Sequence, residues 1–108
     1  MKRIEKYTYR VEWSEEDGAH IAYCLEFPSL AAHGSAPEKA LSEIQTVVAA
    51  AVKWMDESGE QVPEPIGAKK YRGNISLRVS PDIHRRLAIL SAEAGISLNQ
   101  YIISKITL

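Results

Sequence analysis

The sequence has almost no cysteine, no long apolar run and almost no net charge. Its single cysteine, Cys24, cannot form an internal disulfide bond. No segment is long and apolar enough for the core of a signal peptide or for a membrane span. We therefore expect a protein of the reducing cytoplasm that has no membrane partner.

The small net charge of −1 hides two parts of opposite sign. Residues 1–66 carry six Lys and Arg against twelve Asp and Glu, a net charge of −6, and residues 67–108 carry seven against two, a net charge of +5. The acidic part suits a basic partner and the basic part suits a polyanion. Chance segregation of surface charge in a short chain is the alternative. A chain of 108 residues can bury one modest core, or two small cores that partner chains complete.

The first third of the sequence predicts a small antiparallel sheet. Polar and apolar residues alternate over residues 4–13, as a half-buried strand requires. A polar turn at residues 14–18 and a β-rich run at residues 19–26 complete a hairpin. We expect Pro28 to break this run, and a short third strand to follow at residues 30–33.

A long amphipathic helix is expected after this sheet. Ser35 is placed to cap its first turn, Pro37 lies near that turn, and apolar residues recur at helical spacing up to a stop near Gly59. Such a helix must lie across the sheet. Residues 59–67 contain two prolines and two glycines, which predicts a linker, with a short edge strand as an alternative.

The last forty residues predict a strand and two helices. Residues 71–79 alternate between apolar and polar side chains, and Ser80 with Pro81 then marks a helix start. Gly95 is the expected left-handed terminator of that helix, and Ser97 with Gln100 forms a capping box for a final helix. These are the parts of a ribbon-helix-helix module.

One strand and two short helices cannot close a core alone, so dimerisation is predicted as a folding requirement. In the dimer two copies of the strand form an antiparallel ribbon, with one face turned inward. The predicted dimer core consists of Ile75, Leu77, Val79, Leu87 and Ile102.

The opposite face of the ribbon predicts a DNA contact, because a two-stranded ribbon fits the major groove. Arg78 suits guanine, Asn74 suits adenine, and Ser76 suits either base. The remaining predicted DNA-contacting residues are Lys70 and Arg72 near the phosphates, and Ser97 and Leu98 through backbone amides at a helix start. An ordinary amphipathic edge strand and a solvated basic face are the alternatives, the latter above all for Arg85 and Arg86.

The sequence predicts neither catalysis nor a metal or cofactor site. Nuclease chemistry needs converging carboxylates around metal ions, whereas Glu15, Glu16 and Asp17 share one turn. The three histidines lie on different predicted elements without a ligand at metal-binding spacing. Cys24 lies in an apolar strand context, which favours a buried inert thiol.

The chain resembles HicB antitoxins over nearly its whole length. The C-terminal resemblance rests on Asn-Ile-Ser-Leu-Arg-Val-Ser-Pro at 74–81, His-Arg-Arg-Leu-Ala at 84–88 and Ala-Gly-Ile-Ser-Leu-Asn-Gln-Tyr-Ile at 94–102. The N-terminal resemblance rests on Pro-Ser-Leu at 28–30, His-Gly-Ser at 33–35 and Pro-Glu-Lys-Ala-Leu at 37–41, which look like that family's partial RNase H-like domain.

The resemblance implies an α+β fold in two domains joined by a linker. Residues 1–62 would form a toxin-binding domain with a small antiparallel sheet on one helix, residues 63–70 a linker, and residues 71–108 a ribbon-helix-helix domain. The first domain would block an RNA-cleaving HicA toxin, and the second would bind operator DNA and repress its own operon as a homodimer or dimer of dimers. On the basis of charge alone, the candidate toxin contacts are Glu15, Glu16, Asp17 and Glu26. The alternative is a stand-alone repressor whose N-terminal domain senses a ligand or oligomerises.

Overall fold

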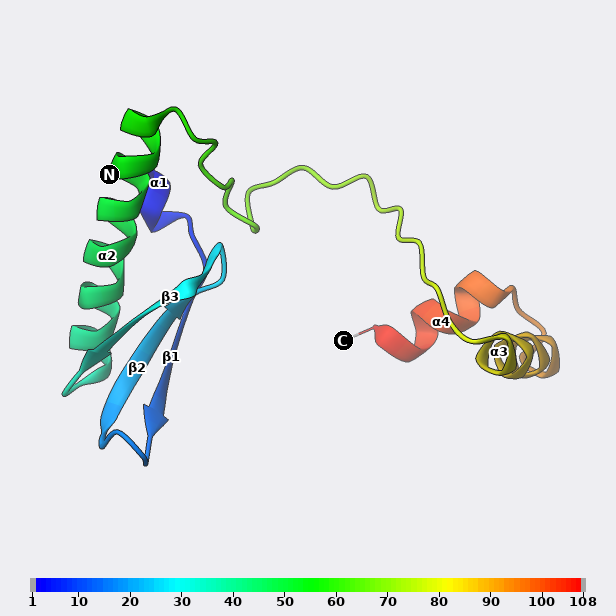
Figure 1. Ribbon diagram of the computed structural model, residues 1–108. Coiled ribbons are helices and arrows are strands. Elements are labelled where there is room, and N and C mark those ends of the chain that lie inside the picture. Colours follow the sequence, from blue (N-terminus) through cyan, green and yellow to red (C-terminus); the bar gives the residue numbers. More distant parts are fainter. Residues whose placement is uncertain (1, 108) are drawn as a thin grey trace. The chain divides into compact units, whose positions relative to one another are not determined.

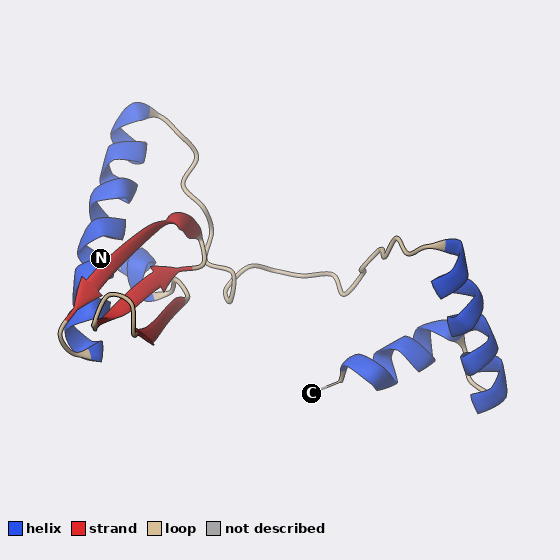
Figure 2. Cartoon of the chain, turned by 60° about the horizontal axis from the view of Figure 1, so that its bottom comes forward, coloured by secondary structure: helices blue, strands red, loops and turns tan. Residues whose placement is uncertain are grey.

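The computed structural model describes residues 2–107, and these residues form two units. The N-terminal unit spans Met1–Tyr71 and the C-terminal unit spans Arg72–Leu108. Figure 2 shows the loop that connects the last helix of the first unit to the first helix of the second. The elements in chain order are α1 (Lys2–Glu5), β1 (Tyr9–Ser14), β2 (Ala19–Cys24), β3 (Phe27–Gly34), α2 (Pro37–Ser58), α3 (Pro81–Ala94) and α4 (Leu98–Ile106).

The three strands form one antiparallel sheet in the order β1-β2-β3, which confirms the predicted hairpin. Ser14 pairs with Ala19 at the tip of the β1–β2 hairpin. Between them Gly18 adopts a φ of +60° and donates its N–H to the Ser14 carbonyl at 2.8 Å. A glycine tolerates this left-handed conformation without steric cost, so the turn closes tightly.

The prediction of a strand over residues 4–13 is wrong at its beginning. Residues 2–5 form the short helix α1, and β1 begins only at Tyr9. The reason lies in the partner strand, because β2 ends at Cys24, opposite Tyr9, and the Leu25 N–H donates to Thr8 as the chain turns away. Residues before Thr8 therefore have no strand beside them.

The second run ends at Cys24, before Pro28, and the third strand is longer than predicted and includes Pro28. β3 runs from Phe27 to Gly34 and contains Pro28 as its second residue. Because β3 is an edge strand of the sheet, it has positions whose N–H groups pair with no strand, and a proline is tolerated there.

Helix α2 lies across one face of the sheet and builds the core (Figure 1). Its inward positions Ala40, Ile44, Val48 and Val52 are fully buried against Ala22, Cys24 and Ala32 of the sheet. The helix stops at Gly59, which has a φ of +76°, as predicted. The predicted cap at Ser35 is wrong: Ala36 is the N-cap residue, it makes no side-chain cap bond, and Pro37 is the first helical residue.

β3 approaches the first turn of α2 closely at Gly34. A Cβ atom on Gly34 would lie 2.8 Å from the Ala40 Cα and 2.8 Å from the Lys39 carbonyl carbon, and nearer still to the Ala40 nitrogen. Only a residue without a side chain fits this site. The sheet and the first turn of the helix are thus in backbone contact.

The segment after α2 is irregular, and the alternative of an edge strand at residues 59–67 is wrong. Residues 60–65 have no regular secondary structure and residues 66–68 form a turn. Even so, Val62 packs against the core of the N-terminal unit. This part of the predicted linker therefore belongs to the first unit.

The two C-terminal helices follow their predicted start and stop signals. The Ser80 side chain accepts a hydrogen bond from the Ile83 N–H, and Gly95 ends α3 at a φ of +70°. Ser97 and Gln100 form the predicted capping box at the start of α4. These features use only neighbouring residues, so sequence was sufficient to find them.

Candidate functional site

The segment before α3 carries the predicted functional face. The single chain forms no strand at residues 71–79, because none of the other described residues pairs with this segment. Its alternate apolar side chains are open to solvent, with Ile75 79%, Leu77 63% and Val79 46% exposed. Three large apolar side chains in water at every second position indicate a surface that a partner covers.

The two helices of the C-terminal unit also expose apolar side chains. The largest exposed apolar side chains of α3 and α4 are Ile83, Ile89, Leu90, Ile103 and Ile106, while Leu87 and Ile102 are half-buried. At 100° per residue the apolar side chains of α4, from Tyr101 to Ile103, span an arc of about 200°. One neighbouring helix cannot cover so wide an arc. The contact of α3 with α4 buries Ser91 but leaves most of this apolar surface outside.

The polar residues of the predicted DNA-binding face are exposed as well. Asn74, Ser76 and Arg78 alternate with the apolar residues, and Lys70 and Arg72 precede them. Ser97 needs a correction: its N–H donates to Gln100 Oε1 at 3.1 Å, so this amide is used inside the capping box. Of the two amides predicted to meet a phosphate, that of Leu98 remains.

The arginines of α3 differ in their surroundings. Arg85 lies 3.9 Å from Asp82 within the same helix, and both side chains are largely exposed. Arg86 makes no ion pair with any of residues 2–107. The two arginines thus add positive charge beside the ribbon segment without a fixed geometry.

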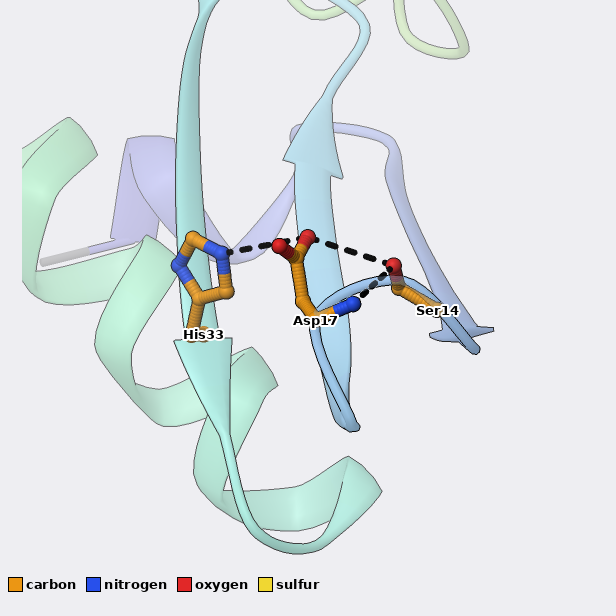
Figure 3. Close-up of polar contacts among 3 residues, drawn as sticks. All are labelled: Ser14, Asp17 and His33. Carbon is orange, nitrogen blue, oxygen red and sulfur yellow. Dashed lines mark hydrogen bonds and ion pairs between the residues drawn. The ribbon is translucent and has the colours of Figure 1, made fainter.

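In the N-terminal unit the predicted acidic residues separate into two environments. Glu15 and Glu16 are exposed at the β1–β2 turn. Asp17 accepts a hydrogen bond from Ser14 Oγ at 3.2 Å and lies 3.7 Å from His33 Nε2 on β3 (Figure 3). The hairpin tip therefore presents carboxylates on a turn that Asp17 braces.

Glu26 lies in the second environment, inside the fold. Only 9% of its surface is exposed. Oε1 accepts the Thr8 N–H at 2.9 Å, and Oε2 accepts the Ile66 N–H at 2.8 Å and the Thr8 hydroxyl at 3.2 Å. These bonds give Glu26 a role in the fold that charge counting missed, and its carboxylate is not presented to a partner.

The hydrogen bonds to Glu26 also change its acidity. Burial alone would raise its pKa, but backbone N–H donors, those of Ile66 and Thr8 foremost, outweigh burial and lower the pKa below the ordinary value of 4.5. The charged form therefore stabilises the folded unit above pH 4.5, and this contribution is lost as the pH falls through the lowered pKa of the folded state.

A pH-dependent stability is the first testable prediction. Urea unfolding of the protein should show a midpoint that declines below pH 4.5, and Glu26→Gln should flatten that decline. At neutral pH the same substitution should cost about 1–3 kcal/mol, because it leaves buried donors without a charged acceptor. Glu64→Gln, a change of an exposed carboxylate, should keep both the decline and the stability. A decline of the same size in Glu26→Gln would assign the effect to other carboxylates.

The cluster at the hairpin tip does not have the order of a catalytic triad. In the Ser14, Asp17 and His33 cluster the carboxylate lies between serine and histidine, so the histidine does not contact the hydroxyl that it would have to deprotonate (Figure 3). Burial raises the pKa of the Cys24 thiol, which disfavours the thiolate. Within residues 2–107 no three His, Cys, Asp or Glu side chains gather as metal ligands would.

The geometry defines a class: an α+β chain whose acidic sheet unit is joined to a basic two-helix unit with uncovered apolar surface. The model of the HicB family matches residues 57–106, which comprise the end of α2, the segment between α2 and α3, α3 and all of α4. This match confirms the predicted resemblance to the HicB family over residues 57–106, while residues 1–56 lie outside it. The resemblance indicates an antitoxin-like role with a toxin as partner. No curated protein and no solved structure matches the chain. None of the described helices has the length and apolar character of a membrane span.

Proposed function

We propose that this protein is the antitoxin of a HicAB-type system, which neutralises an RNA-cleaving HicA toxin and represses its own operon. The observation that carries the proposal is the alternating, exposed segment at residues 74–79 inside the HicB match. Its apolar residues call for a second copy and its polar residues suit DNA. In this proposal the protein acts by binding and has no catalytic activity of its own.

The second copy covers the apolar residues of the segment at 74–79 and the apolar arc of α4. Two segments at residues 74–79 pair antiparallel, so that Ile75, Leu77 and Val79 of both chains face a shared core. The wide apolar arc of α4 then packs on its own α3 and on the partner's helices. Each such side chain taken out of water contributes about 1.5–3 kcal/mol, which makes folding of this unit inseparable from dimerisation.

In the dimer the polar face of the ribbon enters the major groove. Asn74, Ser76 and Arg78 of both chains meet base edges, while Lys70, Arg72 and the Leu98 amide meet phosphates. Contacts between N-terminal units would join two ribbon dimers. Such an assembly could bind two half-sites of an operator at once, and because the two dimers are linked, the overall affinity would rise.

Arg78→Ala tests the direct reading of bases. We expect a loss of about 1–3 kcal/mol at the cognate operator and a smaller loss on random DNA, because a guanidinium that pairs with guanine contributes only at the correct base. Titration of labelled duplexes at fixed salt measures both losses. Arg86→Ala is the matched control, expected to weaken both duplexes equally. Equal losses with Arg78→Ala would make Arg78 a phosphate contact.

The N-terminal unit covers the toxin in this proposal. Glu15 and Glu16 project from the hairpin tip, and Asp17 is kept in place by Ser14. Carboxylates at an exposed tip raise the encounter rate with a basic RNA-binding protein through long-range attraction.

The double variant Glu15→Lys with Glu16→Lys should slow association with the toxin about tenfold or more at low salt, with little change at high salt. The toxin for this experiment is the chain that co-purifies from the native host. The control is Glu43→Lys with Glu57→Lys, a reversal of equal size on exposed positions of α2. If the control slows association equally, net charge rather than the hairpin tip carries the attraction. If no small basic chain co-purifies, the protein is a repressor without a toxin.

A further inference from the structure

The chain that leaves α2 does not leave the N-terminal unit at once. Residues 62–66, which we name the strap, have no regular secondary structure, yet they contact the unit at three points. Val62 packs against the core, the Pro63 carbonyl accepts the Tyr7 hydroxyl at 2.7 Å, and the Ile66 N–H donates to Glu26 Oε2 at 2.8 Å.

Both side chains that hold the strap are themselves fixed. Tyr7 is 5% exposed, and its ring packs edge-on against Phe27 at 5.5 Å between centroids. Glu26 is held at the sheet end by the two bonds from Thr8. The Tyr7 hydroxyl and the Glu26 carboxylate are therefore fixed independently of the strap. Little conformational entropy has to be lost at these two groups when the strap binds to them.

The strap is also stiff in itself. Pro63 and Pro65 flank Glu64, and each proline ring fixes its own φ and restricts the residue before it. Few conformations compete with the bound one, so two hydrogen bonds and one apolar contact are enough to hold the segment. At its far end the Tyr71 hydroxyl donates to the Ile66 carbonyl at 2.9 Å.

We propose that Glu26 and Tyr7 form a latch that holds the strap on the N-terminal unit, so that the chain departs from the unit only after the strap rather than at the end of α2. Neither residue contacts DNA or toxin in the proposed function; both are positioning residues for the tether. Residues 67–73, the tether, then connect the latched unit to the ribbon. The effect of the latch on DNA binding rests on the proposed function, whereas the attachment of the strap to the N-terminal unit does not.

The latch changes how far the ribbon can reach. A tether of residues 67–73 spans at most about 25 Å when fully extended. Opening the latch would add residues 60–66 and double that limit to about 50 Å. One turn of DNA separates half-sites by about 34–36 Å, so the shorter tether restricts the half-site spacings that one assembly bridges, and the longer one relaxes the restriction.

Amide exchange at Ile66 in the full-length protein tests the latch directly. We expect slow exchange at Ile66 in the unaltered chain and exchange at least tenfold faster in the double variant Tyr7→Phe with Glu26→Gln. Tyr7→Phe alone removes the hydroxyl but keeps the ring beside Phe27, so its fold is preserved and exchange should rise by a smaller factor. Glu64→Gln, which changes the exposed strap carboxylate, should leave Ile66 unchanged.

Backbone relaxation of the strap separates a latch from a merely structural role. Residues 62–66 should move with the N-terminal unit in the unaltered chain and with residues 67–73 in the double variant, while amides of Ala22 and Val48 stay rigid. The latch is overturned if residues 62–66 already move with the tether in the unaltered chain. An unchanged exchange rate at Ile66 in both variants overturns it as well.

Operator fragments with varied half-site spacing then test the consequence. The unaltered protein should bind within a narrow range of spacings and the double variant within a wider one. If the Ile66 amide exchanges faster in the double variant but the range of bound half-site spacings stays the same, the latch does not control how far the ribbon reaches. Absence of DNA binding at every spacing overturns the proposed function, while the exchange result for the latch stands.

Discussion

Replacing Leu77 with lysine is expected to weaken dimerisation at least a thousandfold. Leu77 is 63% exposed in the single chain and is the middle apolar residue of the segment that would form the ribbon. In the proposed dimer a twofold axis would place two copies of Leu77 in one core, so the loss would count twice, about 3–6 kcal/mol before the cost of burying an amine. A thousandfold change corresponds to about 4 kcal/mol. Sedimentation across the micromolar range should show the particle mass fall by half.

The matched control for Leu77→Lys is Ile89→Lys. Ile89 lies on α3 and is 52% exposed, but at 100° per residue it points about 160° away from Leu87 and about 100° away from Leu90. Lysine at this position should leave the oligomer intact. A dimer that survives Leu77→Lys and fails with Ile89→Lys would place the interface on the other side of α3 and would contradict the ribbon.

Gly34→Ala should destabilise the N-terminal unit by about 3 kcal/mol, although it adds a single methyl group. The added Cβ would lie within 2.8 Å of the Ala40 Cα and of the Lys39 carbonyl carbon, and both belong to the backbone. Backbone atoms cannot rotate away as a side chain can, so β3 and the first turn of α2 would have to separate. Thermal unfolding should show a midpoint lower by more than about 10 °C.

Gly67→Ala provides the control for Gly34→Ala. A Cβ at Gly67 meets no atom within 4 Å, and its φ lies outside the range that favours glycine. The melting temperature should change little or rise slightly, because alanine restricts the unfolded chain. A comparable loss at both glycines would show that chain flexibility, rather than the contact of β3 with α2, governs the effect.

Sequence predicted best what neighbouring residues decide. The caps at Ser80 and Ser97 and the terminators Gly59 and Gly95 each depend on a few positions along the chain, and the structure confirms all four. The hairpin was predictable for the same reason, because its turn and its alternation are local. The cap predicted at Ser35 is wrong, because Ala36 is the N-cap residue and makes no side-chain cap bond.

The rest depended on partners that are distant in sequence. The pairing of β1 with β2 decides where the first strand starts, and the edge position of β3 decides that Pro28 is tolerated. Glu26 appeared in the sequence as one acid among twelve in residues 1–66, and only the fold brings Thr8 and Ile66 to its oxygens. The DNA and dimer contacts are different in kind, since they stay predictions until a second chain and a duplex are present.

The burial of Cys24 gives the protein a built-in reporter. It is the single thiol of the chain, only 1% of it is exposed, and burial raises the pKa of that thiol. A maleimide or a disulfide reagent can reach its sulfur only when the sheet and α2 come apart. The rate of labelling therefore measures how often the N-terminal unit opens, and it does so without a tag or an added dye.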